Sequence, residues 1–315
     1  MLISVIVPAH NPHRPRLSRV LAALASQTLE AGNWEVVLVD NASSPAIELT
    51  EIAPSMRAPL RVLREPRPGL TWARRCGLEA SSGELCVFVD DDNVLAPNYL
   101  AAAVSLFSAR PAVGAAGGPS RPEFEVAPPS WTAEFFPLLA LRDLGPAPLF
   151  AKLERSQDRL PVYPACAPIG AGLVLRRTAA QAWLNAGGTS PLTDRVGSSL
   201  SSGGDNDIVF SLLRAGWEVA YHPELALTHL IPAARVDPDY LARLNRGIQH
   251  SWMEVLTRHS ANPWPRVSPW GCELRKAKSF FARRGWRRPA ERIRWQGDCG
   301  HFEGRRLRSP VDPVS

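Results

Sequence analysis

The sequence predicts an α/β protein with a doubly wound, mostly parallel central sheet, flanking helices and a basic, helical C-terminal extension. The first observation is a set of four short segments that are apolar throughout, which is typical of strands covered on both faces. They are residues 2–7, 34–39, 60–63 and 85–89. The second is helical spacing of apolar residues between the first and second strands and between the third and fourth, which predicts right-handed crossovers.

The helices of this half follow from apolar spacing and from the residues that bound them. The first, over residues 16–29, repeats leucine and valine every three or four positions. The second, over 70–83, closes at Gly83, because glycine suits a helix end. The third, over 98–109, follows Pro97, which the first turn of a helix tolerates.

Residues 119–168 differ in composition from the rest of the chain. They contain ten prolines, which break regular structure, together with many aromatic residues and leucines. We therefore expect an ordered but irregular surface. Beyond it we expect, in order, a strand at 169–177, a Gly/Ser-rich loop at 197–207, a helix at 207–216 and a short strand between His222 and His229.

Composition limits the class of protein. The 315 residues, 45% hydrophobic and 21% charged, suit one large α/β domain or one domain with an appendage. No apolar run reaches the about 18 residues of a membrane span, and the N-terminus lacks the pattern of a signal peptide. The five cysteines form no CxxC pair, so we expect reduced thiols, no zinc site and a cytoplasmic protein.

The net charge of +6 is concentrated near the C-terminus. Residues 273–308 contain twelve Arg and Lys against four acids, interspersed with aromatic residues. This pattern favours peripheral binding to an anionic membrane surface, at the inner face of the membrane, with about 1 kcal/mol from each cation. The alternative is a solvated basic tail packed by its own aromatics. Gly285 and Pro289 argue against one long helix, and no recognised nucleic-acid motif occurs, so nucleic acid is not an expected partner.

Carboxylates follow two of the predicted strands, at the edge where open α/β sheets bind ligands. Asp40 ends the second strand, where it can accept hydrogen bonds from a ribose or a base, or cap a turn. Asp90, Asp91 and Asp92 follow the fourth strand. Their mutual repulsion favours a bound Mg²⁺ or Mn²⁺, although an acidic run also occurs in solvated turns. Neither GxGxxG nor GxxxxGK[ST] occurs, which counts against dinucleotide-binding and P-loop proteins.

Later residues add weaker candidates. Asp205 is placed as the N-cap of a predicted helix, where its carboxylate could take a proton from a hydroxyl group. Asp207, in the same turn, is interpreted as a capping residue. His229 becomes a metal ligand only together with a carboxylate-bound cation. Trp131 is interpreted first as a core residue and alternatively as a platform for a sugar ring.

Five segments of the chain occur in the order found in the family-2 glycosyltransferases of the GT-A fold, and they span residues 3–230. They are "VIVPAHN", "VVLVDNAS", "GLTWARRCGLEASSGELCVFVDDDN", "IGAGLVLRR" and "GGDNDIVFSLLRAGWEVAYHPELALTHL". The sequence therefore resembles an inverting, nucleotide-sugar-dependent glycosyltransferase.

The resemblance implies a role for each matching residue. The donor nucleotide would be bound by Pro8, His10, Asn11, Asp40, Arg74, Asp90 and Asp91, with the choice between the last two for the ribose left open. Asp92 matches the acid that binds the divalent metal, and His229 a histidine that reaches the metal or the diphosphate. Asp205 matches the catalytic base, although Gly204 precedes it where the family has Glu. The acceptor side would include Trp131, Gly170, Gly172, Gly204 and Asp207.

The implied reaction moves a sugar from a nucleotide donor, UDP by default, to an acceptor hydroxyl group with inversion, as in polysaccharide biosynthesis. A saccharide, a lipid-linked saccharide or a protein remain open as acceptors. The expected organisation is a donor-binding half at 1–118, an acceptor half with the base at 119–235, and the basic extension at 236–315.

Two other functions are weighed against this one. A catalytically silent sugar-nucleotide-binding or scaffold protein would be expected to lack either Asp92 or Asp205, and both are present. A nucleotidyltransferase would usually have a glycine- and lysine-rich phosphate loop after the first strand, where "PAHNPHRP" has neither residue.

Overall fold

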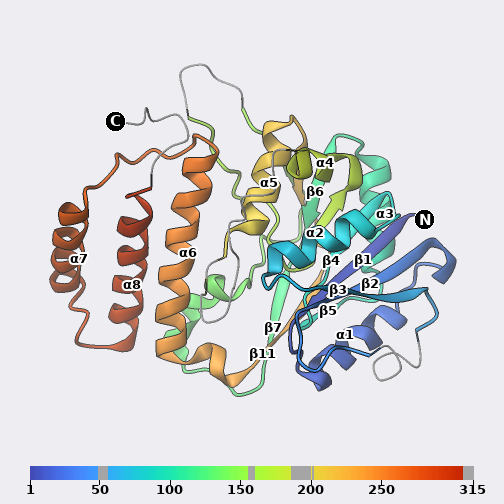
Figure 1. The fold of residues 1–315 in the computed structure, drawn as a ribbon, viewed down its shortest axis with the longest axis horizontal. Helices are drawn as coiled ribbons and strands as arrows, with labels where there is room; N and C mark the ends of the chain where they lie inside the picture. Colours follow the sequence, from blue (N-terminus) through green and yellow to red (C-terminus); the bar gives the residue numbers. More distant parts are fainter. Residues whose placement is uncertain (49–55, 155–159, 186–199, 201, 308–315) are drawn as a thin grey trace.

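The computed structural model describes residues 1–48, 56–154, 160–185, 200 and 202–307. Residues 197–199 and 201 of the predicted Gly/Ser-rich loop, and 308–315 of the basic extension, lie outside the described residues. Figure 1 shows a layered α/β body, with three C-terminal helices side by side at the opposite end of the molecule from the N-terminus.

An eight-stranded sheet forms the centre of the body, in the order β3-β2-β1-β4-β9-β6-β10-β8. Its strands are β1 (Ile3–Ala9), β2 (Trp34–Asn41), β3 (Leu60–Glu65), β4 (Leu85–Phe88), β6 (Val113–Gly117), β8 (Leu149–Ala151), β9 (Val174–Arg176) and β10 (Glu218–Tyr221). Strands β8 and β9 pair antiparallel to their neighbours, and the others share one direction. The predicted doubly wound, mostly parallel sheet is therefore confirmed.

Helices cover both faces of the sheet, which explains why its strands are apolar throughout. One core contains α1 (Arg14–Ala25) and α3 (Tyr99–Ala109), and the other α2 (Leu70–Ala80), α4 (Arg177–Asn185) and α5 (Gly204–Arg214). Within β1, Val5 and Val7 face the first core and Ile6 the second. Helix α2 packs so closely that a Cβ atom at Gly77 would lie 2.3 Å from Cγ2 of Ile6.

A second, three-stranded sheet connects distant parts of the chain. It comprises β5 (Asn93–Leu95), β11 (Leu227–Ile231) and β7 (Ser120–Phe124), with β11 in the middle. The prediction of a short strand between His222 and His229 is wrong, because the strands β10 and β11 lie on either side of residues 222–226. His229 lies inside β11, opposite Asn93 of β5.

Several predicted boundaries are also corrected. The helix predicted to end at Gly83 ends at Ala80, and Gly83 lies in the next loop, where a Cβ atom would meet the backbone nitrogen of Ser4 at 2.4 Å. The strand predicted at 169–177 shortens to β9, and Gly172 before it has a φ of +68°. The pattern of apolar residues in a sequence does not reveal where a segment passes close to another part of the backbone.

The C-terminal extension is helical, as predicted. It contains α6 (Pro238–Arg258), α7 (Pro269–Arg283) and α8 (Pro289–Gly304), and α8 lies between the other two (Figure 1). The predicted break near Gly285 and Pro289 is confirmed. Within the part of the chain that the structure describes, no helix combines the length and hydropathy needed to cross a membrane. The division at 118 and 235 stays a prediction, since β6 pairs with β10 across the first boundary.

Candidate active site

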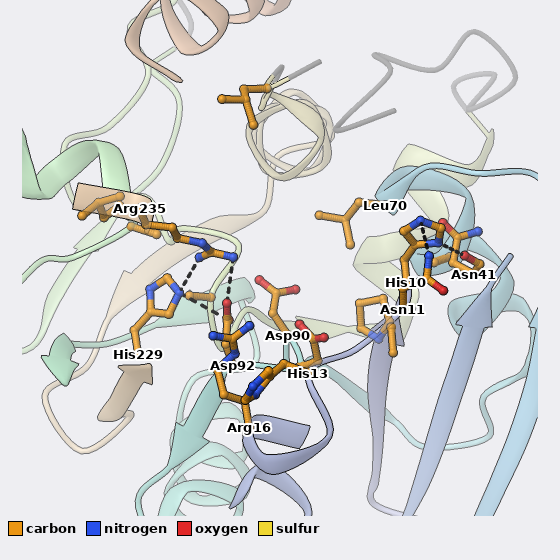
Figure 2. A pocket seen from close by; sticks show the side chains of 18 of the residues that line it. His10, Asn11, His13, Arg16, Asn41, Leu70, Asp90, Asp92, His229 and Arg235 are labelled. Carbon is orange, nitrogen blue, oxygen red and sulfur yellow. Dashed lines mark hydrogen bonds and ion pairs between the residues drawn. The ribbon is translucent and has the colours of Figure 1, made fainter. Parts of the chain in front are cut away.

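A cavity of about 410 Å³ opens where the carboxyl ends of β1, β2 and β4 meet (Figure 2). This is the edge at which open α/β sheets bind their ligands. Predicted site residues that line the cavity are Pro8, His10, Asn11, Asp90, Asp91, Asp92 and His229. Helix α6 and the residues before it close the far side through Arg235, Tyr240 and Leu244. The volume falls within the range of small-molecule sites.

Asp92 occupies the floor of this cavity and is almost fully buried. Its carboxylate lies 2.9 Å from Nη2 of Arg235 and 3.3 Å from Nε2 of His229, and it accepts a hydrogen bond from Nδ2 of Asn93 at 3.0 Å (Figure 2). The pairing of β5 with β11 produces this arrangement, because it sets His229 opposite Asn93. The antiparallel pairing therefore joins residues that are far apart in sequence.

The other two acids of the triplet have different surroundings. Asp90 faces Nη2 of Arg74 at 3.4 Å. Burial raises the pKa of Asp91 to about 7, with further contributions from the carboxylates of Asp92 and Asp90. Removing these carboxylates from water and placing them side by side favours either a proton or a cation at the triplet.

Asp92 and His229 are the candidate ligands for a divalent cation on the cavity floor, and in this structure the guanidinium of Arg235 contacts both of them. Oδ1 of Asp92 and Nε2 of His229 are 3.3 Å apart, a spacing that two adjacent ligands at about 2.0–2.2 Å from one octahedral ion can adopt. Within the described ranges no three His, Cys, Asp or Glu side chains are grouped to hold a metal. A Mg²⁺ ion usually binds through one or two carboxylates and completes its coordination with water and phosphate oxygens, so a cation at Asp92 and His229 would need such further ligands.

The loops after β1 and β2 form the opposite end of the cavity. Asn11 has a φ of +45°, which asparagine tolerates better than most residues. Its backbone nitrogen donates to Oγ of Ser43 at 2.9 Å, and its Oδ1 accepts from the backbone nitrogen of Ser44 at 2.9 Å. Nδ1 of His10 lies 2.6 Å from the carbonyl oxygen of Asn41. These contacts tie the two loops together.

Asp40 supports this wall without lining the cavity. Its buried carboxylate accepts hydrogen bonds from the backbone nitrogens of Ser43 and Ile47 and from Arg64. Burial opposes ionisation, but these hydrogen bonds and the Arg64 charge outweigh it and lower the pKa of Asp40. The neighbouring Asn41, which sequence reasoning missed, lines the cavity instead.

Asp205 lies in the first turn of α5, and the predicted N-cap position is wrong because Gly203 precedes the helix. Its Oδ2 accepts a hydrogen bond from the backbone nitrogen of Gly170 at 2.7 Å. A Cβ atom at Gly170 would lie 2.9 Å from Nη2 of Arg74 and 3.0 Å from Oδ2 of Asp205. Arg74 in turn reaches Asp90. Arg74 and Asp205 therefore both lie close to Gly170, although Asp205 does not line the cavity itself.

The remaining acceptor-side candidates lie elsewhere. Trp131 packs against Phe135 in a core beside α6, as its first interpretation predicts. Gly172 accepts a hydrogen bond from the hydroxyl group of Tyr99 inside the main core. Gly204 is the buried first residue of α5.

Asp207 does not belong to the cavity, and its side chain does not cap the helix. It is buried and accepts hydrogen bonds from Nε1 of Trp183 at 3.0 Å and Nε2 of His259 at 2.9 Å, with Nη1 of Arg258 at 3.4 Å. Residues two apart on a helix point to different sides. Asp205 and Asp207 therefore contact different parts of the protein.

Sequence reasoning also missed three side chains of the cavity, two arginines and a histidine. His13 and Arg16 enter it from the start of α1, and Arg235 from the segment before α6 (Figure 2). Burial lowers the pKa of Arg235, but the nearby charges, led by that of Asp92, together outweigh burial and raise it. Arg16 could have been suspected, because it follows the first strand closely. Arg235 carries no sequence signal of its own.

A sheet of this topology, with acidic and basic side chains around one cavity at the carboxyl ends of its strands, is typical of α/β proteins that bind ligands at that edge. The model of the family "Glycosyl transferase family 2" matches residues 4–180. The chain therefore belongs to glycosyl transferase family 2, and its class of activity is glycosyl transfer.

Similar proteins agree with this assignment. The succinoglycan biosynthesis protein ExoM of Rhizobium meliloti (strain 1021) is 28% identical over 279 residues, which cover 85% of this chain and 79% of that protein. Among solved structures, the mannosyltransferase PcManGT from Pyrobaculum calidifontis, in complex with GDP-Man and Mn²⁺, aligns with a TM-score of 0.56 at 18% identity, over 95% of this chain and 72% of that chain. S. aureus TarS 1-349, in complex with UDP, aligns with a TM-score of 0.51 at 16% identity, over 96% and 89%. These structures show that the fold is GT-A.

Proposed function

We propose that the protein transfers a sugar from a nucleotide-sugar donor to a hydroxyl group of a saccharide acceptor, with inversion, in the synthesis of a polysaccharide. The observation that carries this proposal is that Asp205 and Arg74, the partner of Asp90 in the acid triplet, both lie beside Gly170. The description of ExoM as a succinoglycan biosynthesis protein, and the UDP and GDP-Man complexes of the structural neighbours, support the substrate classes.

In this proposal the cavity binds the donor along its length. The two loops that carry Asn11 and Asn41 hold the nucleoside, and Asp40 keeps those loops in place. Arg16 and Arg235 lie where they can bind diphosphate oxygens, since guanidinium groups pair well with phosphates. Asp90 is oriented by Arg74 towards the ribose end.

Asp92 and His229 hold the divalent cation, Mg²⁺ or Mn²⁺. When bound, the cation supplies positive charge that stabilises the departing nucleoside diphosphate. Arg235 contacts the carboxylate of Asp92 and must move away before Asp92 can bind the ion. The guanidinium group of Arg235 is then available to bind the diphosphate.

Asp205 acts as the base. The backbone nitrogen of Gly170 fixes one carboxylate oxygen, and the other can take the proton of the acceptor hydroxyl as it attacks the anomeric carbon. One base and an in-line displacement lead to inversion, without a covalent intermediate on the protein.

The test compares Asp205→Asn with Asp239→Asn, because Asp239 is also in the first turn of a helix but is exposed at the surface. A panel of sugar nucleotides with Mn²⁺, Mg²⁺ or EDTA is assayed for released nucleoside diphosphate and for transfer to oligosaccharides. We expect Asp205→Asn to reduce kcat by roughly 10²–10⁴-fold with unchanged donor affinity. Asp239→Asn should remain near wild type.

Other outcomes decide between functions. Loss of donor binding in Asp205→Asn would contradict its role as base. Release of pyrophosphate by the wild type would favour a nucleotidyltransferase. Metal-dependent donor binding without turnover on any acceptor or water would favour a silent binding protein.

A further inference from the structure

Helix α7 carries an apolar stripe on its outer surface. Trp270, Leu274 and Phe281 are 75%, 50% and 68% exposed, and Trp286 in the following turn is 58% exposed. Together with Ala277, the three helical residues follow the spacing i, i+4, i+7, i+11, which places them on one face. Trp286 extends the stripe, because its ring lies 5.9 Å from that of Phe281.

The opposite face of α7 accounts for its attachment to the protein. Cys272 is buried there, Nζ of Lys276 lies 3.0 Å from Glu303 of α8, and Nε of Arg283 lies 2.9 Å from Asp298 of α8. Helix α7 is the outermost of the three C-terminal helices (Figure 1). The apolar stripe therefore faces away from the described part of the chain.

Cations surround the stripe. Arg275, Lys278, Arg284, Arg287 and Arg288 are exposed. Within the described residues none of these five forms an ion pair, whereas Lys276 and Arg283, which do, point towards α8. We call the four exposed apolar side chains and these five cations the α7 patch. Its one nearby acid, Glu273, is paired with Lys276.

We propose that the α7 patch docks the protein on an anionic lipid surface. Exposed Trp, Phe and Leu side chains insert at the level of the headgroups, and surrounding Arg and Lys side chains bind anionic lipids. A second copy is a poorer partner, because a symmetric contact would bring like charges together. The proposal does not depend on the identity of the donor or the acceptor. Helix α8 lies between α7 and α6 (Figure 1), and α6 rather than α7 lines the cavity.

The test measures binding of the full chain to vesicles of phosphatidylcholine with or without 30% phosphatidylglycerol, by co-sedimentation at low and high salt. One variant, W270S/L274S/F281S, removes the stripe, and a second, K278Q/R287Q/R288Q, removes three cations. The matched control is V126S/V162S, which removes two exposed apolar side chains outside the patch, 57% and 79% exposed.

We expect the wild type to bind the anionic vesicles, to bind neutral ones weakly and to dissociate as salt rises. The cation variant should bind roughly a hundredfold more weakly, and the stripe variant at least about tenfold more weakly. The control should bind as the wild type does. All variants should keep their melting temperature and their release of nucleoside diphosphate, because the patch makes no contact with the cavity.

The proposal is overturned if the wild type does not bind anionic vesicles at low salt. It is also overturned if both patch variants bind these vesicles as tightly as the control variant does. It is also overturned if light scattering shows a dimer that the stripe variant abolishes while vesicle binding persists, since a second copy would then cover the patch. Salt-sensitive RNA binding without vesicle binding would likewise assign the patch to nucleic acid.

Discussion

Two buried carboxylates in this protein have nearly the same partners and different surroundings. Asp92 faces His229 and Arg235, and Asp207 faces His259 and Arg258. Each group therefore combines one acid, one histidine and one arginine at hydrogen-bonding or ion-pairing distances.

The difference lies in what encloses each group. The ring of Phe210 stacks on His259 with centroids 4.5 Å apart, and Trp183 donates to Asp207. Asp207 lines a cavity of about 390 Å³, and Asp92 one of about 410 Å³. Only the Asp92 cavity lies at the carboxyl ends of β1, β2 and β4, and there two further carboxylates, Asp90 and Asp91, stand beside Asp92. We conclude that residue types alone do not distinguish a structural cluster from a ligand site. The local excess of negative charge and the position at the carboxyl ends of the strands do.

The largest expected effect comes from Asp92→Asn. Loss of this charge should reduce kcat/KM by roughly 10²–10⁴-fold, because the cation and the diphosphate lose an anchor. The free energy of unfolding should change little, since the repulsion within the acid triplet is also relieved. Transfer kinetics and thermal denaturation measure the two quantities. If Asp92→Asn lost stability as strongly as it lost activity, the group around Asp92 would no longer differ from the structural group around Asp207.

Asp207→Asn should lower stability and leave donor binding unchanged, in contrast to Asp92→Asn. It leaves His259 and Arg258 without their carboxylate, which should lower the free energy of unfolding by about 2–3 kcal/mol. Urea denaturation measures this loss. At a temperature where the variant is folded, donor affinity should equal that of the wild type. A fall in donor affinity without a fall in stability would place Asp207 in the active site.

Gly170→Ala tests the packing of Arg74 and the proposed base Asp205 around Gly170. The added Cβ atom meets Nη2 of Arg74 and Oδ2 of Asp205 at 2.9 and 3.0 Å, so the carboxylate must move. We expect kcat to fall by about tenfold or more. Gly32→Ala is the matched control, because no atom lies within 4 Å of its Cβ position. If Gly170→Ala had the kcat of the wild type, the proposed dependence of the base on the packing around Gly170 would be contradicted.

Replacing the arginine of each group gives the smallest effects. Arg235→Ala should tighten binding of Mn²⁺ in the absence of nucleotide by about tenfold, because the guanidinium competes for Asp92. It should also weaken donor binding. Arg258→Ala should alter neither property and should cost about 1 kcal/mol of stability. Titration followed by electron paramagnetic resonance measures free Mn²⁺. Unchanged metal affinity in Arg235→Ala would show that Arg235 does not compete.

Much of the fold is encoded locally. Continuous apolar segments identify β1, β2 and β4, whose residues are buried on both faces, and also the half-buried edge strand β3. The two breaks in helical pattern near Gly285 and Pro289 separate α7 from α8. The position of the acid triplet behind a buried strand also follows, since the carboxyl ends of parallel strands meet at one edge.

The tertiary structure alone decided which polar residues share a site. His229 reaches Asp92 through the pairing of β5 with β11, and short strands of that kind have little pattern of their own. Arg235 reaches it from a segment before α6, and Asp205 and Asp207 separate because neighbouring helical positions face different elements. A sequence specifies which chemical groups exist and which local structures they favour. Their meeting depends on contacts between distant segments, which leave no periodic signal in the chain.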